Sequence, residues 1–251
     1  MKTRQTVSRE ALLAYCNTLL QPENFKDYGP NGLQVEGKRE VGKIVSGVTA
    51  SLALIDAAIE AKADAIFVHH GLFWRGQDGR VVGWMKQRLA KLLAHDINLY
   101  AYHLPLDAHP ELGNNAQLGK VLGFAPLEQR FGDYQLGWLG KPQQNHAAKL
   151  AQHVEKTLGR KVQLITAPEH LQRDIKTVAW CTGGAQDWFE AAIAAGADAF
   201  ITGELSEPQT HLARECGVAF LACGHHATER YGAPATAAHI AAQLGLEHEF
   251  V

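Results

Sequence analysis

A stretch of this 251-residue chain occurs twice, and the repeat limits the fold more than any other pattern in the sequence. DAAIEAKADAIFVHHG at residues 56–71 aligns without a gap with EAAIAAGADAFITGEL at residues 190–205. Each copy follows an apolar run, KIVSGV at 43–48 or KTVAWC at 176–181, and so predicts a strand, an Ala-rich helix and a second strand. This order forms a right-handed crossover between parallel strands. We therefore expect two similar halves, each built on a parallel βαβ unit.

The two halves continue alike and enclose a segment that does not fit the repeat. Each half predicts one further strand, NLYAYH in the first and VAFLAC in the second, and each ends on Leu-Gly. Between them the sequence predicts a strand or hairpin, an amphipathic helix that stops at Gly159, and another strand. The expected fold class is α/β, with pseudo-symmetric halves at residues 1–123 and 175–251 and a small α/β insert at residues 124–174.

Charge, hydropathy and cysteine spacing narrow the class of protein. The formal net charge of −2 includes no block of like charges, which argues against a nucleic-acid partner. No apolar run approaches the roughly 20 residues of a membrane span. The opening MKTRQTVSREALLAYCNTLL is too polar for a secretory signal and predicts a helix. The four cysteines lie far apart without a C-x-x-C pair, which is typical of reduced thiols in a cytoplasm. We expect a cytoplasmic protein without a membrane partner.

Polar side chains gather where the repeated strands end. In open parallel α/β sheets, ligands bind beyond the carboxyl ends of the strands, so these positions are the first candidates for a site. The first half offers a pair of histidines and then H-L-P-L-D, and the second offers Gly-Glu and then H-H-A-T-E. The candidate residues are His69, His70, His103, Asp107, Glu204, His225 and Glu229. Imidazole and carboxylate groups hold zinc, iron or manganese, and the set is rich enough for two ions.

The spacing of these residues predicts their local geometry. Adjacent residues of a strand point to opposite faces, so His69 and His70 can share a site only if the chain turns, which Gly71 permits. His225 and Glu229 lie four apart at the start of a helix and would share one face. His103 and Asp107 have a proline between them, so we expect that pair in a loop.

Simpler explanations exist for each motif taken alone. A single histidine at a strand end is more often structural, and either His-x-x-x-acid pair could cap a helix. Their repetition at corresponding strand ends favours metal binding. The stretch DYGPNGLQVEG is interpreted as a turn. The loop CTGGAQDW could offer backbone N–H groups to a phosphate, although it lacks both glycine-rich phosphate-binding patterns.

Five motifs, taken together, resemble a known family. DYGPNGLQVEG, FVHHGLFW, HLPLDAHPELGNNAQL, FITGELSE and GHHATE occur in this order across nearly the whole chain, as in the NIF-three-like family. Many members of that family carry the name GTP cyclohydrolase I type 2 homologue. The resemblance implies a cytoplasmic, ring-shaped homohexamer with a dinuclear metal centre, and it places His103 and Glu204 close to that centre. The metal ligands that it implies are His69, His70, Asp107, His225 and Glu229.

Two classes of function are compatible with these residues. Two divalent ions, as iron, zinc or manganese, would suit hydrolysis of a nucleotide or of a cyclic amide or amidine, with His103 or Glu204 moving protons. The resemblance does not identify the small-molecule substrate. The alternative is a metal-binding scaffold or regulatory interaction protein without a reaction of its own. Asp107→Asn separates the two, because a scaffold would lose assembly together with the metal.

Overall fold

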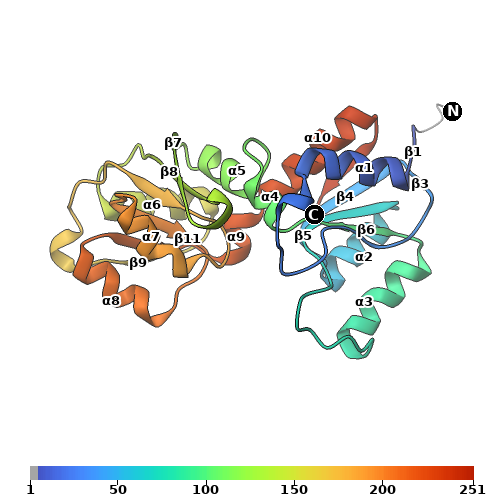
Figure 1. Ribbon diagram of the computed structural model, residues 1–251, viewed down its shortest axis with the longest axis horizontal. Helices are drawn as coiled ribbons and strands as arrows, with labels where there is room; N and C mark the ends of the chain where they lie inside the picture. Colours follow the sequence, from blue (N-terminus) through green and yellow to red (C-terminus); the bar gives the residue numbers. More distant parts are fainter. Residues whose placement is uncertain (1–4) are drawn as a thin grey trace. The chain divides into compact units, whose positions relative to one another are not determined.

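The computed structural model describes residues 5–251, and the first four residues of the predicted opening helix lie outside the described part. The chain divides into two compact units (Figure 1). The first unit contains the described residues up to Gly113 together with Gly232–Val251, and the second contains Asn114–Tyr231. Each unit is an α/β structure with its own sheet, which confirms the expected fold class.

The first unit contains the opening and closing elements of the chain. Its strands are β1 (Val7–Ser8), β2 (Gly32–Val35), β3 (Glu40–Val41), β4 (Lys43–Thr49), β5 (Ala65–His70), β6 (Asn98–Ala101) and β13 (Glu247–Phe250). Its helices are α1 (Arg9–Leu20), η1 (Pro22–Asn24), α2 (Leu52–Glu60), α3 (Gly83–Ala94), α4 (Leu104–Ala108) and α10 (Gly232–Leu244).

The second unit contains the middle of the chain. Its strands are β7 (Ala125–Phe131), β8 (Gly137–Lys141), β9 (Gln163–Ile165), β10 (Val178–Trp180), β11 (Ala199–Thr202) and β12 (Ala219–Ala222). Its helices are α5 (Asn114–Val121), η2 (Asp133–Gln135), α6 (Ala147–Leu158), η3 (Pro168–His170), η4 (Gln186–Trp188), α7 (Phe189–Ala194), α8 (Glu207–Cys216) and α9 (His225–Glu229).

The first unit is a five-stranded sheet, in the order β13-β4-β5-β6-β2, with helices on both faces. In Figure 1, α1 and α10 lie above this sheet and α2 and α3 lie below it. Because side chains alternate along β5, Phe67 packs with the cluster under α1 and α10, whereas Ile66 and Val68 pack with the cluster over α2 and α3. A strand buried on both faces explains the continuous apolar run before the two histidines.

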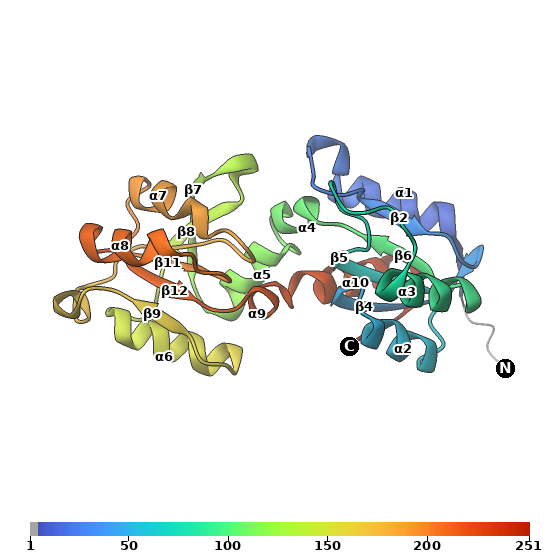
Figure 2. The same cartoon turned by 90° about the horizontal axis from the view of Figure 1, so that it is seen from below.

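The second unit repeats this arrangement around a six-stranded sheet, in the order β7-β8-β10-β11-β12-β9. Figure 2 shows α7 and α8 on one side of the sheet and α6 on the other. Trp180 is fully buried in the cluster on the α6 side. Phe189, Phe200 and Phe220 contact one another on the opposite side, with ring centroids 5.0 to 5.9 Å apart. In both units the sheet is closed in by apolar side chains from each face.

The repeat corresponds to equivalent parts of the two units. Strands β4, β5 and β6 pair in parallel, as do β10, β11 and β12, which confirms the predicted parallel units. The Ala-Asp turn that both copies share has one structural role. Asp64 Oδ2 accepts hydrogen bonds from the N–H groups of Gly42 and Lys43 at the start of β4. Asp198 Oδ2 does the same for Lys176 and Thr177 just before β10.

We predict that Asp64→Ala lowers the free energy of unfolding by about 2 to 3 kcal/mol, because two backbone donors lose a charged acceptor. Asp64 also accepts a hydrogen bond from Lys38, whose side chain is 45% exposed. Lys38→Met removes only that surface ion pair and should cost less than about 1 kcal/mol. Urea unfolding of both variants measures the difference. If Asp64→Ala and Lys38→Met lowered the free energy of unfolding equally, the hydrogen bonds from the backbone to Asp64 would contribute little to stability.

The segment between the repeats is part of the second sheet. The predicted hairpin is β7 and β8, the amphipathic helix is α6 with Gly159 as its left-handed C-cap, and the last strand is β9. At the other end of the chain, β13 pairs in parallel with β4 and α10 packs on β4 and β5, so both belong to the first unit. The compact units therefore differ from the segments 1–123, 124–174 and 175–251 expected from the repeat. Within residues 5–251, none of the helices has the length and apolar character needed to cross a membrane.

Candidate metal centre

His69 and His70 are the last two residues of β5, between the parallel neighbours β4 and β6. His69 is fully buried and His70 is partly buried. Their ring centroids lie 4.4 Å apart with an angle of 43° between the planes. The two imidazoles therefore approach each other within the strand itself, without a turn between them, and Gly71 lies beyond both.

Each of these imidazoles is oriented through its Nδ1 atom. His69 Nδ1 lies 3.1 Å from the carbonyl oxygen of Tyr102, and a carbonyl can only accept, so Nδ1 carries the proton and Nε2 the lone pair. His70 Nδ1 lies 3.1 Å from Thr49 Oγ1, on the strand beside it. Metal-ligating histidines are typically held in this way by a partner on the other ring nitrogen.

His103 and Asp107 bring two further groups to the same unit. They lie at the start and within α4, so the expectation of a loop was wrong: Pro105 occupies the first turn, where its missing N–H costs no helix hydrogen bond. Asp107 is 8% exposed, and its Oδ1 lies 3.6 Å from His69 Nε2. Nitrogen atoms of His69, His70 and His103 lie within 4.8 Å of one another, close enough to hold a metal ion.

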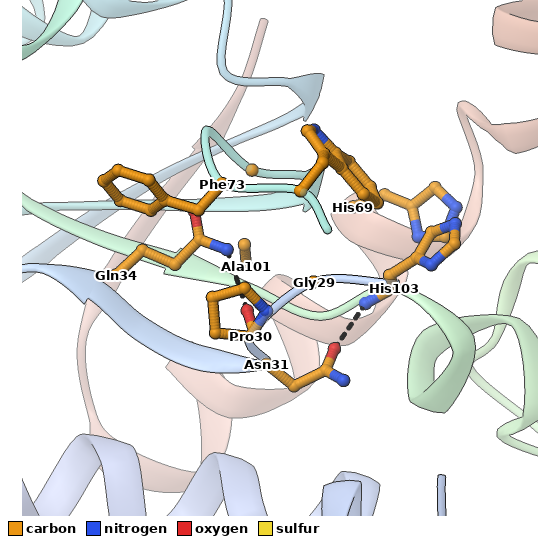
Figure 3. Close-up of a pocket in the computed structure, with 10 residues that line it drawn as sticks. Gly29, Pro30, Asn31, Gln34, His69, Phe73, Ala101 and His103 are labelled. Atoms are coloured by element: carbon orange, nitrogen blue, oxygen red, sulfur yellow. Dashed lines mark hydrogen bonds between the residues drawn. The ribbon is translucent and has the colours of Figure 1, made fainter. Parts of the chain in front are cut away.

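Asp27 is a site residue that the sequence interpretation missed. The stretch DYGPNG forms the expected bend, but it also wraps around the start of α4. Asp27 Oδ1 lies 2.7 Å from His103 Nδ1, and Oδ2 accepts hydrogen bonds from Leu104 N–H and Asn31 Nδ2. Asn31 Oδ1 in turn accepts from His103 N–H, as Figure 3 shows. The motif therefore fixes His103 through a buried carboxylate, whose side chain is 3% exposed.

Burial acts to raise the pKa of Asp27, but hydrogen bonds from His103 and Asn31 outweigh it and lower the pKa from 3.8 to about 2. The ionised carboxylate therefore stabilises the fold above pH 4 by about 2 kcal/mol, and this contribution is lost as the pH falls towards 2. We predict that the melting temperature falls more steeply from pH 5 to pH 2.5 in the native chain than in Asp27→Asn. Calorimetry with chelator present tests this, with the exposed Asp187→Asn as control. Parallel curves for all three proteins would contradict it.

An aromatic side chain borders the histidines of the first unit. The Trp74 ring meets His103 edge to face at 5.1 Å between centroids and lies 5.9 Å from His70. Trp74 lines a small pocket together with His69, His103 and the Gly29–Pro30–Asn31 bend. Figure 3 shows His69, His103 and this bend. The pocket places the Trp74 ring beside the imidazoles of His69 and His103.

In the second unit, three glycines follow the three parallel strands and bring the strand ends close together. Gly183, Gly203 and Gly224 come after β10, β11 and β12. Gly203 N–H donates to Gly183 O at 2.8 Å, and Gly224 N–H donates to Gly203 O at 2.9 Å. A Cβ on Gly183 would overlap Glu229 Oε1. These glycines therefore let α9 start directly against the strand ends.

His225 stands between two carboxylates at the start of α9. Its Nδ1 lies 3.0 Å from Glu204 Oε1, and its Nε2 lies 3.3 Å from Glu229 Oε1. The predicted i, i+4 pairing on one helix face is confirmed. The hydrogen bond with Glu229 raises the pKa of His225, burial opposes this, and Glu204 adds to the increase. Glu229 is 3% exposed, whereas Glu204 lies at the surface and orients the imidazole.

Other polar residues of the second unit serve different roles. The Gly183 N–H donates to Thr228 Oγ1 and the Ala185 N–H to Thr202 Oγ1, so the loop CTGGAQDW uses these donors internally and does not present them to a phosphate. His226 is exposed. His211 pairs with Glu207 on the exposed side of α8, with 2.6 Å between Nε2 and Oε1.

Comparisons with known proteins agree with this structure. The family model of Duf34/NIF3 (NGG1p interacting factor 3) matches residues 7–251. A Neisseria meningitidis protein named GTP cyclohydrolase 1 type 2 homolog is 55% identical over 242 residues, 96% of each chain. A Pseudomonas aeruginosa protein of the same name is 49% identical and covers 98% of this chain and 97% of its own.

A solved structure has the same fold over almost the whole length. The protein YbgI, described as of unknown function, superposes with a TM-score of 0.92 at 46% identity and covers 98% of both chains. The match extends over both units and over every motif that carries the candidate residues. The chain therefore belongs to the Duf34/NIF3 (NGG1p interacting factor 3) family.

Proposed function

We propose that this protein binds two divalent transition-metal ions and is a metal-dependent hydrolase. One arrangement that occurs in both units carries the proposal. In each, an imidazole is fixed through Nδ1 and directs Nε2 at a buried carboxylate: His69 at Asp107, 3.6 Å away, and His225 at Glu229, 3.3 Å away. A nitrogen lone pair and a carboxylate oxygen at such distances suit a shared cation.

The donor set fits a pair of transition-metal ions. The proposed ligands are His69, His70, Asp107, His225 and Glu229, which together offer three imidazoles and two carboxylates. Nitrogen-rich sites with carboxylates and no thiolate favour iron, zinc or manganese over magnesium or calcium. Partners on the second ring nitrogens, Tyr102 O, Thr49 Oγ1 and Glu204 Oε1, support the ligand role.

Divalent ions, when bound, supply Lewis acidity that polarises a carbonyl, amidine or phosphoryl group and promotes attack by water. Side chains of the protein itself orient the imidazoles and transfer protons. Asp27 holds His103 by its Nδ1, which presents Nε2 as the atom that gives or takes a proton. Glu204 keeps the ring of His225 in one orientation. The Trp74 ring lies beside His70 and His103 and shields these two imidazoles from water on that side.

We propose a nucleotide or a cyclic amide or amidine as the substrate, in agreement with the name GTP cyclohydrolase 1 type 2 homolog that the relatives carry. We further propose a homohexamer and a cytoplasmic location. All four cysteines are free thiols, and three of them are buried, which suits a reducing compartment. Sedimentation analysis of the metal-loaded protein tests the hexamer.

The test of the function compares two variants of the metal-loaded protein. Asp107→Asn removes a proposed ligand and is expected to lose both the metal and the hydrolysis of nucleotides or cyclic amides. Mass spectrometry of the reaction products measures the hydrolysis. His103→Gln keeps the ligands and is expected to retain the metal while turnover falls about 100-fold or more. A protein with full metal content and intact assembly that hydrolyses none of these compounds would contradict the enzyme and favour a scaffold.

A further inference from the structure

A cavity in the second unit contains two cations that the proposed hydrolysis does not use. It has a volume of about 750 Å³ and opens beyond the carboxyl ends of β11 and β12. Its lining includes Arg160 and Lys161 together with Gly203, Glu204, Gly224 and His225. The volume is in the range of small-molecule sites, and the position is where parallel sheets bind ligands.

The chain fixes the turn that carries these two exposed cations, and it places the guanidinium of Arg160. Gly159 ends α6 in a left-handed conformation, with φ of 67°, and turns the chain towards the start of β9. Glu155 Oε1 accepts a hydrogen bond from the Val162 N–H at 2.9 Å and thereby holds the turn. Arg160 Nε donates to the carbonyl of Lys161 at 3.3 Å. A Cβ on Gly224 would overlap Arg160 Nη1, so the guanidinium lies against the residue that precedes His225.

The charges of the cavity favour an anion. Among residues 5–251, neither Arg160 nor Lys161 forms an ion pair with a carboxylate. Glu204, the acidic residue of the lining, already accepts the hydrogen bond from His225 Nδ1. The two cations therefore leave a positive excess even before a metal ion is present. An Arg fork beside a Lys matches the geometry and charge of a phosphate dianion.

We propose that Arg160 and Lys161 bind the phosphate group of the substrate in this cavity, next to His225. The inference rests on the proposed function and narrows its substrate class to phosphorylated small molecules. Arg160 is then the specificity-determining residue, because its guanidinium can hold two phosphate oxygens at once. Lys161 adds charge without that geometric constraint.

The experiment measures the binding of methyl phosphate by ³¹P NMR titration of zinc-loaded and of chelator-treated protein. Arg160→Gln is expected to weaken binding about tenfold or more in both forms. Arg214→Gln removes the same charge from an exposed position on α8, outside the cavity, and is expected to leave the affinity within about twofold. Succinate, a dicarboxylate added as a competitor, is expected to displace methyl phosphate with an affinity at least about tenfold weaker than that of methyl phosphate itself.

The outcomes separate this inference from the proposed function. If the protein binds no metal but Arg160→Gln still weakens phosphate binding to the chelator-treated form, the phosphate site stands and the metal centre fails. Equal affinities of Arg160→Gln and Arg214→Gln, the absence of phosphate binding by the native chain, or equal binding of succinate would each overturn the phosphate site. Circular dichroism of Arg160→Gln confirms that its fold is intact.

Discussion

Replacing Gly183 with alanine is expected to destabilise the protein by about 3 kcal/mol or more and to remove at least one of the proposed metal ions. Gly183 has φ of 69°, a conformation that costs an L-residue roughly 1 to 2 kcal/mol. The new methyl group would also overlap Glu229 Oε1 and approach His225 Nε2 to 3.1 Å. Glu229 is buried and has little room to yield, so the carboxylate and the imidazole must separate. Thermal unfolding and elemental analysis measure the two effects.

The neighbouring glycine provides the matched control. A Cβ on Gly184 would lie 3.6 Å from His225 Cε1, an ordinary van der Waals distance, and Gly184 does not have a positive φ. Gly184→Ala is therefore expected to change stability by less than about 1 kcal/mol and to keep its metal. If both variants behaved alike, the close approach of the β10 end to α9 would have no part in holding Glu229.

Removal of the metal is expected to have a comparably large effect on stability. A ligand that binds only the folded chain, present at about 1,000 times its dissociation constant, stabilises the protein by about 4 kcal/mol. Chelation should therefore lower the melting temperature of the native chain by several degrees. Asp107→Asn should melt at the same temperature with and without chelator, because the buried carboxylate near His69 is lost.

Two further variants test whether the change in melting temperature on chelation comes from the proposed metal centre. Asp78→Asn changes an exposed carboxylate that pairs with Arg80 at the surface, and it should keep the full response to chelator. Thr49→Val removes the group that orients His70 and should weaken metal binding about 10- to 100-fold without abolishing it. A native chain whose melting temperature does not respond to chelator or to added metal would contradict the proposed centre.

Local patterns in the sequence predicted the elements of the site well. The apolar run before His69 and the four-residue spacing of His225 and Glu229 both depend on neighbours close in sequence, and both the predicted strand and the shared helix face are confirmed. The repeat predicted parallel strands in both units because each copy contains its own crossover. Proline in the first turn of α4 led to the wrong expectation of a loop, since the same residue both starts helices and ends them.

Local sequence patterns did not predict the contacts between distant parts of the chain. Asp27 and His103 are 76 positions apart in the sequence. The neighbouring Pro30 and Asn31 predict a turn, but a turn does not indicate which residue the Asp27 carboxylate contacts. Gly232–Val251 belongs to the first unit, contrary to the expected boundary, because β13 pairs with β4, a contact between distant parts of the sequence. Arg160 lies in the segment that interrupts the repeat, and only the folded sheet brings it against Gly224.

The most direct measurement is elemental analysis of the protein purified without a chelator or a histidine tag, beside Glu229→Ala. The proposed centre predicts about two transition-metal ions per chain in the native protein and about one or none in the variant. The variant should still fold, as circular dichroism would show. No metal in either protein, even after reconstitution with iron, zinc or manganese, would contradict the dinuclear centre and leave these histidines with a structural role.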